Sequence, residues 1–261
     1  MTDNSPLITT DFDNGIFRIG IARPEKRNAL TMAMYDALSA ALQAAEQDQQ
    51  ARVILVHGTA SCFTSGNDLS DFAKHPPQGE NSPVFRFLRT ISQTTKPLLA
   101  MVSGPAVGIG TTMLLHCDLV YADETARFQL PFVNLGLCPE AASSYLLPRR
   151  IGPQRAAEML LLGEMVDAAT AQEYGLINQL FDSATLEDRV LAKATRLAAQ
   201  PPESVRLTKS LLKEQQQDLV AKLMRTEGAL FLQQLAKPEA QEAISAFLQG
   251  RKADFSQYSS R

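Results

Sequence analysis

Short apolar runs that alternate with helical patterns constrain the fold of this chain most strongly. We expect strands at 53–57, 98–102, 119–121 and 126–128, and helices at 84–93 and 109–116. Strands that alternate with helices are typical of an α/β domain, in which functional residues gather on loops at strand ends. At 261 residues, the chain is long enough for a domain of about 200 residues with an appendage.

The chain opens with a pattern that predicts an antiparallel hairpin and then a helix. Apolar segments at 7–10 and 16–21 flank Asn14-Gly15, and Asn-Gly supplies the positive φ angles of a type I′ turn. Thr31 can cap a helix that continues to about residue 47, because apolar residues recur there at helical spacing.

The pattern changes after residue 140. It predicts one strand at 177–181 and helices at 153–162, 168–174, 186–199, 203–212, 217–235 and 238–248. Pro201-Pro202 interrupts helix formation and marks a boundary between a core at 1–200 and a C-terminal helical region at 201–261. We expect this region to pack on a neighbouring subunit through an apolar face of Leu219, Leu223, Leu230, Phe231 and Leu235.

The composition excludes two classes of partner. With 20% charged residues and a formal net charge of -3, the chain offers no basic surface for nucleic acid. No apolar run approaches the roughly 18 residues that span a bilayer, so no membrane partner is expected. Cys62, Cys117 and Cys138 are odd in number and widely spaced, which favours packing roles and a cytoplasmic location. The three histidines lack metal-ligand spacing, so we expect no metal and no separate cofactor.

Two glycine-containing loops are suited to bind an oxyanion with backbone amides. Gly66 follows the 53–57 strand, and its missing Cβ lets the backbone approach a ligand, with the Asn67 amide directed into a pocket. Gly108 and Gly110 flank Ile109 at the start of a helix, whose first amides lack intrahelical partners. The alternative is that these glycines serve only tight turns and helix packing, since glycine loops are common.

Glu140 is the candidate catalytic base. It stands on a turn after Pro139, ahead of a run of small residues and an apolar helix. The alternative role is that of a first-turn glutamate that stabilises the N-terminus of that helix. The helix dipole would lower its pKa, whereas apolar neighbours such as Phe132 would raise it, and both outcomes stay open at this point.

The sequence resembles the crotonase (enoyl-CoA hydratase/isomerase) superfamily. The resemblance lies in four segments that follow the family's order, namely 23–30, 63–69, 102–110 and 117–122, and it extends through Gly163 and Ala171 to 176–177. It implies a spiral of ββα units, a C-terminal trimerisation region and acyl-CoA thioesters as substrates. A homotrimer or a dimer of trimers is therefore expected, with coenzyme A as part of the substrate.

The resemblance also assigns roles to individual residues. It implies that the thioester oxygen binds between the amides of Asn67 and Ile109. The residues expected to bind the rest of the substrate are Lys26, Arg27, Ala29, Ser65, Gly66, Asp68, Leu69, Gly108 and Phe132. For Lys26 and Arg27 the alternative is a solvated charge pair, and for Asp68 it is a cap on the next helical turn.

Two departures from the family pattern narrow the expected reaction. Family hydratases carry glutamates at the positions that correspond to Thr112 and Phe132, and these side chains cannot activate water and deliver a proton. The segment 131–145 instead resembles peroxisomal-type Δ3,Δ2-enoyl-CoA isomerases, in which the glutamate of the Pro-Glu pair is the acid/base. We therefore expect a 3-enoyl-CoA to 2-enoyl-CoA isomerase of fatty-acid oxidation. The alternatives are another crotonase reaction, such as hydration, or a non-catalytic acyl-CoA scaffold.

Overall fold

The Asn14-Gly15 dipeptide produces the predicted hairpin in the computed structural model, which describes residues 6–258. β1 (Ile8–Asp13) pairs antiparallel with β2 (Ile16–Ile21). Asn14 and Gly15 have φ angles of 50° and 80°, the left-handed values that a type I′ turn requires. The hairpin prediction is confirmed, with β1 continuing three residues beyond its expected end at residue 10.

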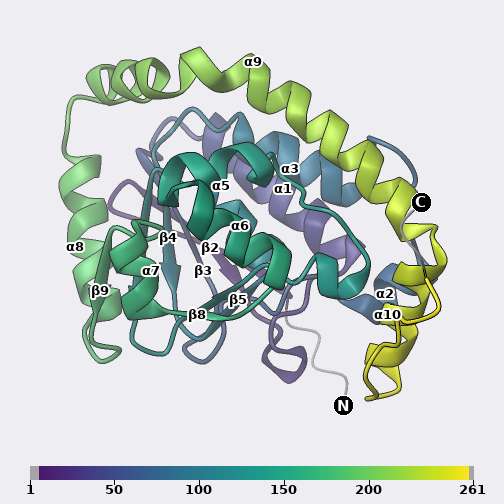
Figure 1. The fold of residues 1–261 in the computed structure, drawn as a ribbon. Helices are drawn as coiled ribbons and strands as arrows, with labels where there is room; N and C mark the ends of the chain where they lie inside the picture. Colours follow the sequence, from purple (N-terminus) through teal and green to yellow (C-terminus); the bar gives the residue numbers. More distant parts are fainter. Residues whose placement is uncertain (1–5, 259–261) are drawn as a thin grey trace.

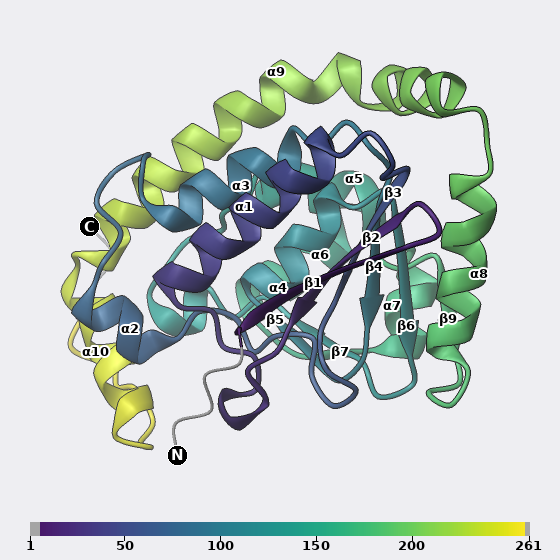
Figure 2. The same cartoon turned by 180° about the vertical axis from the view of Figure 1, so that it is seen from behind.

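Six strands form the main sheet, in the order β1-β2-β3-β4-β6-β9 (Figures 1 and 2). Beyond the hairpin the neighbours are parallel, through β3 (Val53–His57), β4 (Leu98–Val102), β6 (Leu119–Asp123) and β9 (Gln179–Phe181). Strands of a parallel sheet are apolar on both faces because both faces are covered. In β3, Ile54 belongs to the main core, whereas Val53 and Leu55 pack with α8 (Leu186–Ala198).

Most predicted helices are present to within two residues at each end. They are α1 (Met32–Gln47), α3 (Pro83–Ser92), α6 (Pro153–Leu162), α7 (Ala168–Tyr174), α8 and α10 (Pro238–Leu248). Thr31 caps α1 as expected, since its side chain accepts a hydrogen bond from the Met34 amide. The segment 109–116 divides into the α-helix α4 (Ile109–Thr112) and the 3-10 helix η2 (Met113–His116).

The prediction of two helices at 203–212 and 217–235 was wrong. The structure has one helix, α9 (Pro202–Leu235), of 34 residues. The connecting residues 213–216 are Lys-Glu-Gln-Gln, all good helix formers, so nothing in the chain interrupts the hydrogen-bond ladder. Pro202 stands at the first turn of α9, where its missing amide costs no intrahelical bond.

A second, three-stranded sheet makes the chain a spiral. It has the order β5-β7-β8, from β5 (Pro105–Val107), β7 (Arg127–Gln129) and β8 (Val166–Asp167). β4 and β5 follow each other but lie in different sheets, and so do β6 and β7. Each turn of chain therefore adds one strand to each sheet, which confirms the α/β class and the spiral. The sequence did not predict β5 and β8, which are too short to show a period.

α9 crosses the molecule from the edge at α8 toward α10, on the side that carries α1 and α3 (Figures 1 and 2). The Phe231 ring meets the Phe72 ring of α2 (Leu69–Lys74) edge-on, with centroids 6.3 Å apart. Leu223 and Leu235 also pack on the core of the same chain. Of the five apolar residues expected to face a neighbour, only Leu219 and Leu230 are exposed, at 41% and 47%.

Two further properties of the described chain concern its helices and its cysteines. Within residues 6–258, no helix has both the length and the apolar character that crossing a membrane would require. Cys62 and Cys117 are buried and Cys138 is half-buried, each as a free thiol.

Candidate active site

Successive turns of the spiral stack the two glycine loops side by side. Isolated parallel bridges join Leu30 to Asn67 and Thr64 to Ala106. The Leu30 amide donates to the Gly66 carbonyl over 2.8 Å, and the Leu30 carbonyl accepts from the Asp68 amide over 2.9 Å. Asn67 lies between Gly66 and Asp68, the two residues that bond Leu30. In a parallel bridge such a middle residue directs its own backbone amide to the opposite edge of its strand. The Asn67 amide is thus directed away from Leu30, toward the side on which β5 lies.

The Ile109 amide lies in the next turn of the spiral. Ile109 is the first residue of α4, where an amide has no intrahelical acceptor. The preceding residue, Gly108, has a φ of 55° and a ψ of -116°, and its amide donates to the Gln129 carbonyl over 2.9 Å. This anchor on β7 fixes the entry to α4, and with it the direction of the Ile109 amide.

The glycines also serve the packing that was the alternative explanation for them. A Cβ on Gly66, whose φ is 89°, would lie 2.7 Å from the Val107 carbonyl oxygen, and one on Gly110 would lie 2.7 Å from Cγ2 of Thr64. Both distances are shorter than van der Waals contact. Close packing between the two loops therefore requires glycine at both positions, and it holds the loops that carry the two predicted amides against each other.

Glu140 is buried on a strained turn before α5 (Ser143–Ile151). Its exposed fraction is 3%. The next two residues, Ala141 and Ala142, have left-handed φ angles of 62° and 55°, a conformation that costs a residue with a Cβ about 1–2 kcal/mol. Because Ala142 is the N-cap of α5, Glu140 precedes the helix instead of lying in its first turn, as the alternative role required.

Burial decides the pKa of Glu140, which the sequence left open. Burial raises the pKa from its ordinary value to about 7, a hydrogen bond from Thr112 opposes that rise, and the charge of Glu227 adds to it. The Thr112 hydroxyl donates this bond over 2.8 Å to Oε1. A carboxyl with such a pKa exchanges a proton readily near neutral pH.

The two positions that carry glutamate in family hydratases differ in their surroundings. Thr112 is fully buried on α4, one turn after Ile109, and its hydroxyl contacts Glu140. Phe132 is buried with 5% exposure and precedes the short 3-10 helix η3 (Val133–Leu135). Thr112 therefore contacts the Glu140 carboxyl, whereas Phe132 contributes a buried apolar side chain.

Tyr35 is a site residue that sequence reasoning missed. It lies on α1, is fully buried, and donates its hydroxyl to Oδ1 of Asn67. Its ring packs against Phe87, with centroids 5.6 Å apart. Burial and then the Glu140 charge raise the pKa of Tyr35 well above its ordinary value, so the hydroxyl remains a donor. Only its place on an apolar helical face is visible in the sequence, and that pattern does not single it out.

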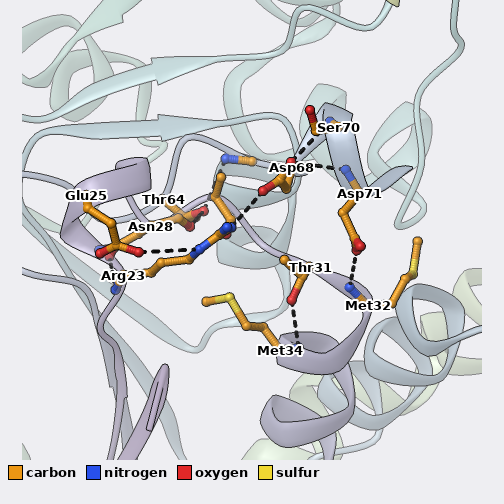
Figure 3. A network of polar contacts seen from close by, with 12 residues as sticks. Arg23, Glu25, Asn28, Thr31, Met32, Met34, Thr64, Asp68, Ser70 and Asp71 are labelled. Atoms are coloured by element: carbon orange, nitrogen blue, oxygen red, sulfur yellow. Dashed lines mark hydrogen bonds and ion pairs between the residues drawn. The ribbon is translucent and has the colours of Figure 1, made fainter. Parts of the chain in front are cut away.

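A polar network joins the predicted substrate-binding segments around Arg23 (Figure 3). Arg23 donates to Asp68 over 2.7 Å and to the Ala29 carbonyl over 2.9 Å. Asp68 also accepts from the amides of Ser70 and Asp71, so it caps α2. Burial opposes ionisation of Asp68, but these bonds outweigh it and lower its pKa. The carboxylate of Asp68 is therefore engaged within the protein.

The remaining substrate-binding candidates fall into two groups. Lys26 and Arg27 are exposed, and the Arg27 carbonyl accepts a 3.0 Å bond from the Ser65 amide, which brings this turn against the first glycine loop. The half-buried residues Ala29 and Leu69 belong to the same two segments. Gly108 lies on the second loop, and Phe132 lies in the next turn of the spiral, apart from this surface.

The histidines have separate surroundings. His57 ends β3, and His75 faces Asp71 at the surface over 3.0 Å. His116 is buried, and burial lowers its pKa to about 4, so the ring is neutral and its Nε2 donates over 2.9 Å to the carbonyl of Ala141. Among residues 6–258, no group of three or more His, Cys, Asp or Glu side chains could hold a metal ion.

Two cavities adjoin α9, and they share Gly79 and Leu232 in their walls. One, of about 390 Å³, lies between α3 and α9 and includes His116. The other, of about 740 Å³, lies between α2, α10 and the end of α9, and includes Pro76 and Pro77. Within the described chain, Asn67, Ile109 and Glu140 are not part of either wall.

Known proteins share both the sequence and the fold. A family model for enoyl-CoA hydratase/isomerase matches residues 11–258. Human enoyl-CoA delta isomerase 2 is 34% identical over 249 residues, which are 93% of this chain but 63% of the human protein. The 2,3-dehydroadipyl-CoA hydratase of Escherichia coli is 34% identical over 241 residues, 92% of this chain and 94% of that protein. The structure of Pseudomonas aeruginosa OdaA is 44% identical, with a TM-score of 0.91, and the match covers 94% of this chain and 99% of that one.

The chain therefore spans less than two thirds of the length of the human relative. The family model, in contrast, extends over nearly the whole described chain, including both glycine loops and the Glu140 turn. Together with the spiral of paired sheets, this match shows that the chain belongs to the enoyl-CoA hydratase/isomerase family.

Proposed function

We propose that this protein isomerises 3-enoyl-CoA to 2-enoyl-CoA thioesters. The ionised Glu140 carboxylate removes a proton from C2 of the substrate, and the electrons of that C–H bond move into a dienolate. The protonated carboxyl then returns the proton at C4, which forms the new C–H bond and shifts the double bond to C2–C3. One carboxyl acts in turn as base and as acid, so no other reactant is consumed.

The observation that carries this proposal is the burial of the Glu140 carboxyl together with its pKa of about 7. A group that must first accept a proton and then donate it is most effective when its pKa lies near the working pH. Thr112 and Phe132 occupy the positions at which the family resemblance places the glutamates of hydratases. Neither side chain is a carboxyl, so neither can assist Glu140 as a second acid or base.

The stacked loops support the second part of the mechanism. The amides of Asn67 and Ile109 are proposed to donate to the thioester oxygen, where negative charge develops in the dienolate. A preorganised donor of this kind contributes about 3 kcal/mol to the stability of such a transition state. Tyr35 would support the first donor, because its bond to Asn67 limits the movement of that residue.

The substrate is proposed to bind over both groups of candidate residues. Lys26 and Arg27 are exposed and can meet the phosphates of coenzyme A, next to Ser65. The acyl chain is proposed to enter the cavity of about 740 Å³, whose wall includes Phe72, Leu235 and other apolar residues. Phosphates would then lie at the charged surface and the hydrocarbon in the apolar cavity.

Hydration of a 2-enoyl-CoA is the second candidate, because the Escherichia coli relative named as a hydratase is as similar to this chain as the human isomerase, at 34% identity each. Water addition needs one group to activate the water and one to deliver a proton. Glu140 is the one carboxyl that we assign contact with the substrate, and a single carboxyl does not supply both tasks. We therefore propose isomerisation as the main reaction.

One experiment separates the isomerase from the hydratase and from a non-catalytic scaffold. The purified protein is given a 3-enoyl-CoA or a 2-enoyl-CoA, and formation of the conjugated product and loss of the 2-enoyl chromophore are followed separately. Glu140→Gln should lose isomerisation by at least about 1,000-fold, since it removes the acid/base group. Glu158→Gln, at an exposed position of α6, is the matched control and should be unaffected.

Three outcomes would contradict the proposal. Efficient hydration by the wild type would favour the hydratase, binding of CoA esters without turnover would favour the scaffold, and full isomerase activity in Glu140→Gln would exclude Glu140 as the acid/base.

The protein is proposed to form a homotrimer or a dimer of trimers, and light scattering measures the number of subunits. Leu207, Leu211 and Leu212 on α9 are exposed at 48%, 71% and 75%, which supports an interface on this helix.

A further inference from the structure

Glu227 is a second buried carboxyl near the Glu140 turn, and it belongs to the C-terminal helix α9. Its exposed fraction is 6%. Its Oε1 accepts a 3.1 Å hydrogen bond from the Ser144 amide and a second bond from the Ser144 hydroxyl. Its Oε2 has no hydrogen-bond partner within the described part of the chain. A residue 83 positions away in the sequence thus accepts the bonds at the first turn of α5.

The bond from Ser144 to Glu227 ties the turn that carries Glu140 to α9. A second contact, the 2.9 Å bond from His116 to the Ala141 carbonyl, ties the same turn to η2. The two contacts, at Ala141 and Ser144, lie on either side of Ala142. Ala141 and Ala142 are the two alanines with left-handed backbone angles. Because Glu140 directly precedes this pair, the direction of its carboxyl depends on how firmly both contacts hold.

We propose that Glu227 is a positioning residue for Glu140, which anchors the catalytic turn to α9 and places a second negative charge near the catalytic carboxyl. The inference deepens the proposed isomerisation and rests on it. Glu227 is not assigned contact with the substrate, because its bonded oxygen faces the first turn of α5.

The charge of Glu227 acts on Glu140, since neighbouring carboxyls do not ionise independently. Burial raises the pKa of Glu227, and the bonds from the hydroxyl and amide of Ser144 oppose that rise. When Glu227 is ionised, its charge adds to the burial that raises the pKa of Glu140. Repulsion of this kind keeps a proton on Glu140 to higher pH.

The other titratable groups that face the two carboxyls do not supply such a charge. Burial, followed by the charges of Glu227 and Glu140, raises the pKa of the Cys138 thiol. Burial and the charge of Glu140 raise that of the Tyr35 hydroxyl. Both groups are therefore neutral over the working pH range, and they cannot replace the effect of Glu227.

The decisive variant is Glu227→Gln, which keeps an oxygen that accepts from Ser144 but removes the charge. The acid limb of kcat/KM, which reports ionisation of Glu140, should move to lower pH by about half a unit or more. Glu214→Gln, an exposed position on the same helix, is the control and should leave the profile unchanged. Glu227→Ala removes charge and acceptor together, so kcat should also fall about tenfold, with KM changed less.

A second variant tests the inference without altering Glu227. Ser144→Ala removes the hydroxyl that favours the ionised form of Glu227. A more neutral Glu227 repels Glu140 less, so the acid limb should move in the same direction as in Glu227→Gln, by a smaller amount. If both variants keep the wild-type acid limb, or if Glu227→Ala keeps the wild-type kcat, the inference is overturned.

A titration that does not depend on turnover distinguishes failure of this inference from failure of the proposed function. The carboxyl signal of Glu140 is followed by ¹³C NMR in protein labelled at glutamate, with Glu140→Gln used to assign it. A lower midpoint in Glu227→Gln supports the role of Glu227 even if the protein catalyses a different reaction. An unchanged midpoint overturns that role even if Glu140→Gln abolishes isomerisation.

Discussion

The Thr112 hydroxyl and the Glu140 carboxyl are joined by a 2.8 Å hydrogen bond across 28 residues of sequence. Thr112 lies one turn beyond Ile109 on α4, so the same short helix carries a proposed oxyanion donor and a hydroxyl that bonds the proposed base. One helical turn and one hydrogen bond therefore connect the proposed oxyanion donor to the proposed proton carrier.

Thr112→Val tests this bond, because valine keeps the shape of threonine without the hydroxyl. The bond opposes the rise of the Glu140 pKa above its ordinary value. Its loss should raise that pKa further, and the acid limb of kcat/KM should move to higher pH by roughly one unit. Thr90→Val on α3, whose hydroxyl bonds only to its own helix, is the control. An unchanged acid limb would show that the bond does not tune Glu140.

Tyr35→Phe tests the support of Asn67. The variant keeps the ring that packs on Phe87 but removes the hydroxyl bonded to the Asn67 side chain. Without this bond Asn67 is held less firmly, and its backbone amide should stabilise the dienolate less well. The value of kcat should therefore fall about tenfold while KM changes little. Tyr121→Phe, in the core beside α8, is the control. Equal losses of kcat in the two variants would point to a general effect of lost hydroxyls.

Glu140→Gln should make the folded protein more stable at alkaline pH. The wild-type carboxyl has a pKa of about 7 when folded, against 4.5 as its ordinary value, so the folded state binds its proton more tightly. The resulting stability is complete below pH 4.5 and is lost as pH rises through 7. The variant should gain on the order of 3 kcal/mol at pH 8 and progressively less toward pH 5. Denaturant unfolding at several pH values measures this, with Glu158→Gln expected to stay flat.

Ala73→Trp tests the proposed acyl cavity. Ala73 is exposed on α2 and lines the cavity of about 740 Å³, so an indole there occupies part of the space without disturbing the core. Activity on long 3-enoyl chains should fall about tenfold or more, while short chains are little affected. Ala73→Ser is the size control. Equal effects on all chain lengths would place the acyl chain elsewhere.

Local patterns predicted much of the fold because local forces decide those elements. The Asn14-Gly15 turn requires backbone angles that few residue pairs adopt, and Thr31 has a side-chain oxygen at the start of a helical period. β3 and β4 are apolar along their length. α9 was divided wrongly because a polar stretch within a helix and a polar loop look alike until the neighbouring elements are known.

The candidate site shows where local patterns stop being informative. Glu140 could be proposed from its turn and its flanking residues, but its pKa depends on burial, Thr112 and Glu227, which come together only in the fold. Tyr35 and Glu227 lie within helices and resemble ordinary core or surface positions in the sequence. Their contacts with Asn67 and Ser144 span 32 and 83 residues, a separation over which hydrophobic periodicity predicts nothing.

The unbroken course of α9 makes the C-terminal region part of the core and a neighbour of the Glu140 turn at once. At 34 residues it is a rod of roughly 50 Å. A protein that ended at residue 200 would retain every strand of both sheets, as well as Asn67, Ile109 and Glu140. It would lack Glu227, several core residues and one wall of each cavity, so the Glu140 turn would lose its bond to α9 and the proposed acyl site one of its walls.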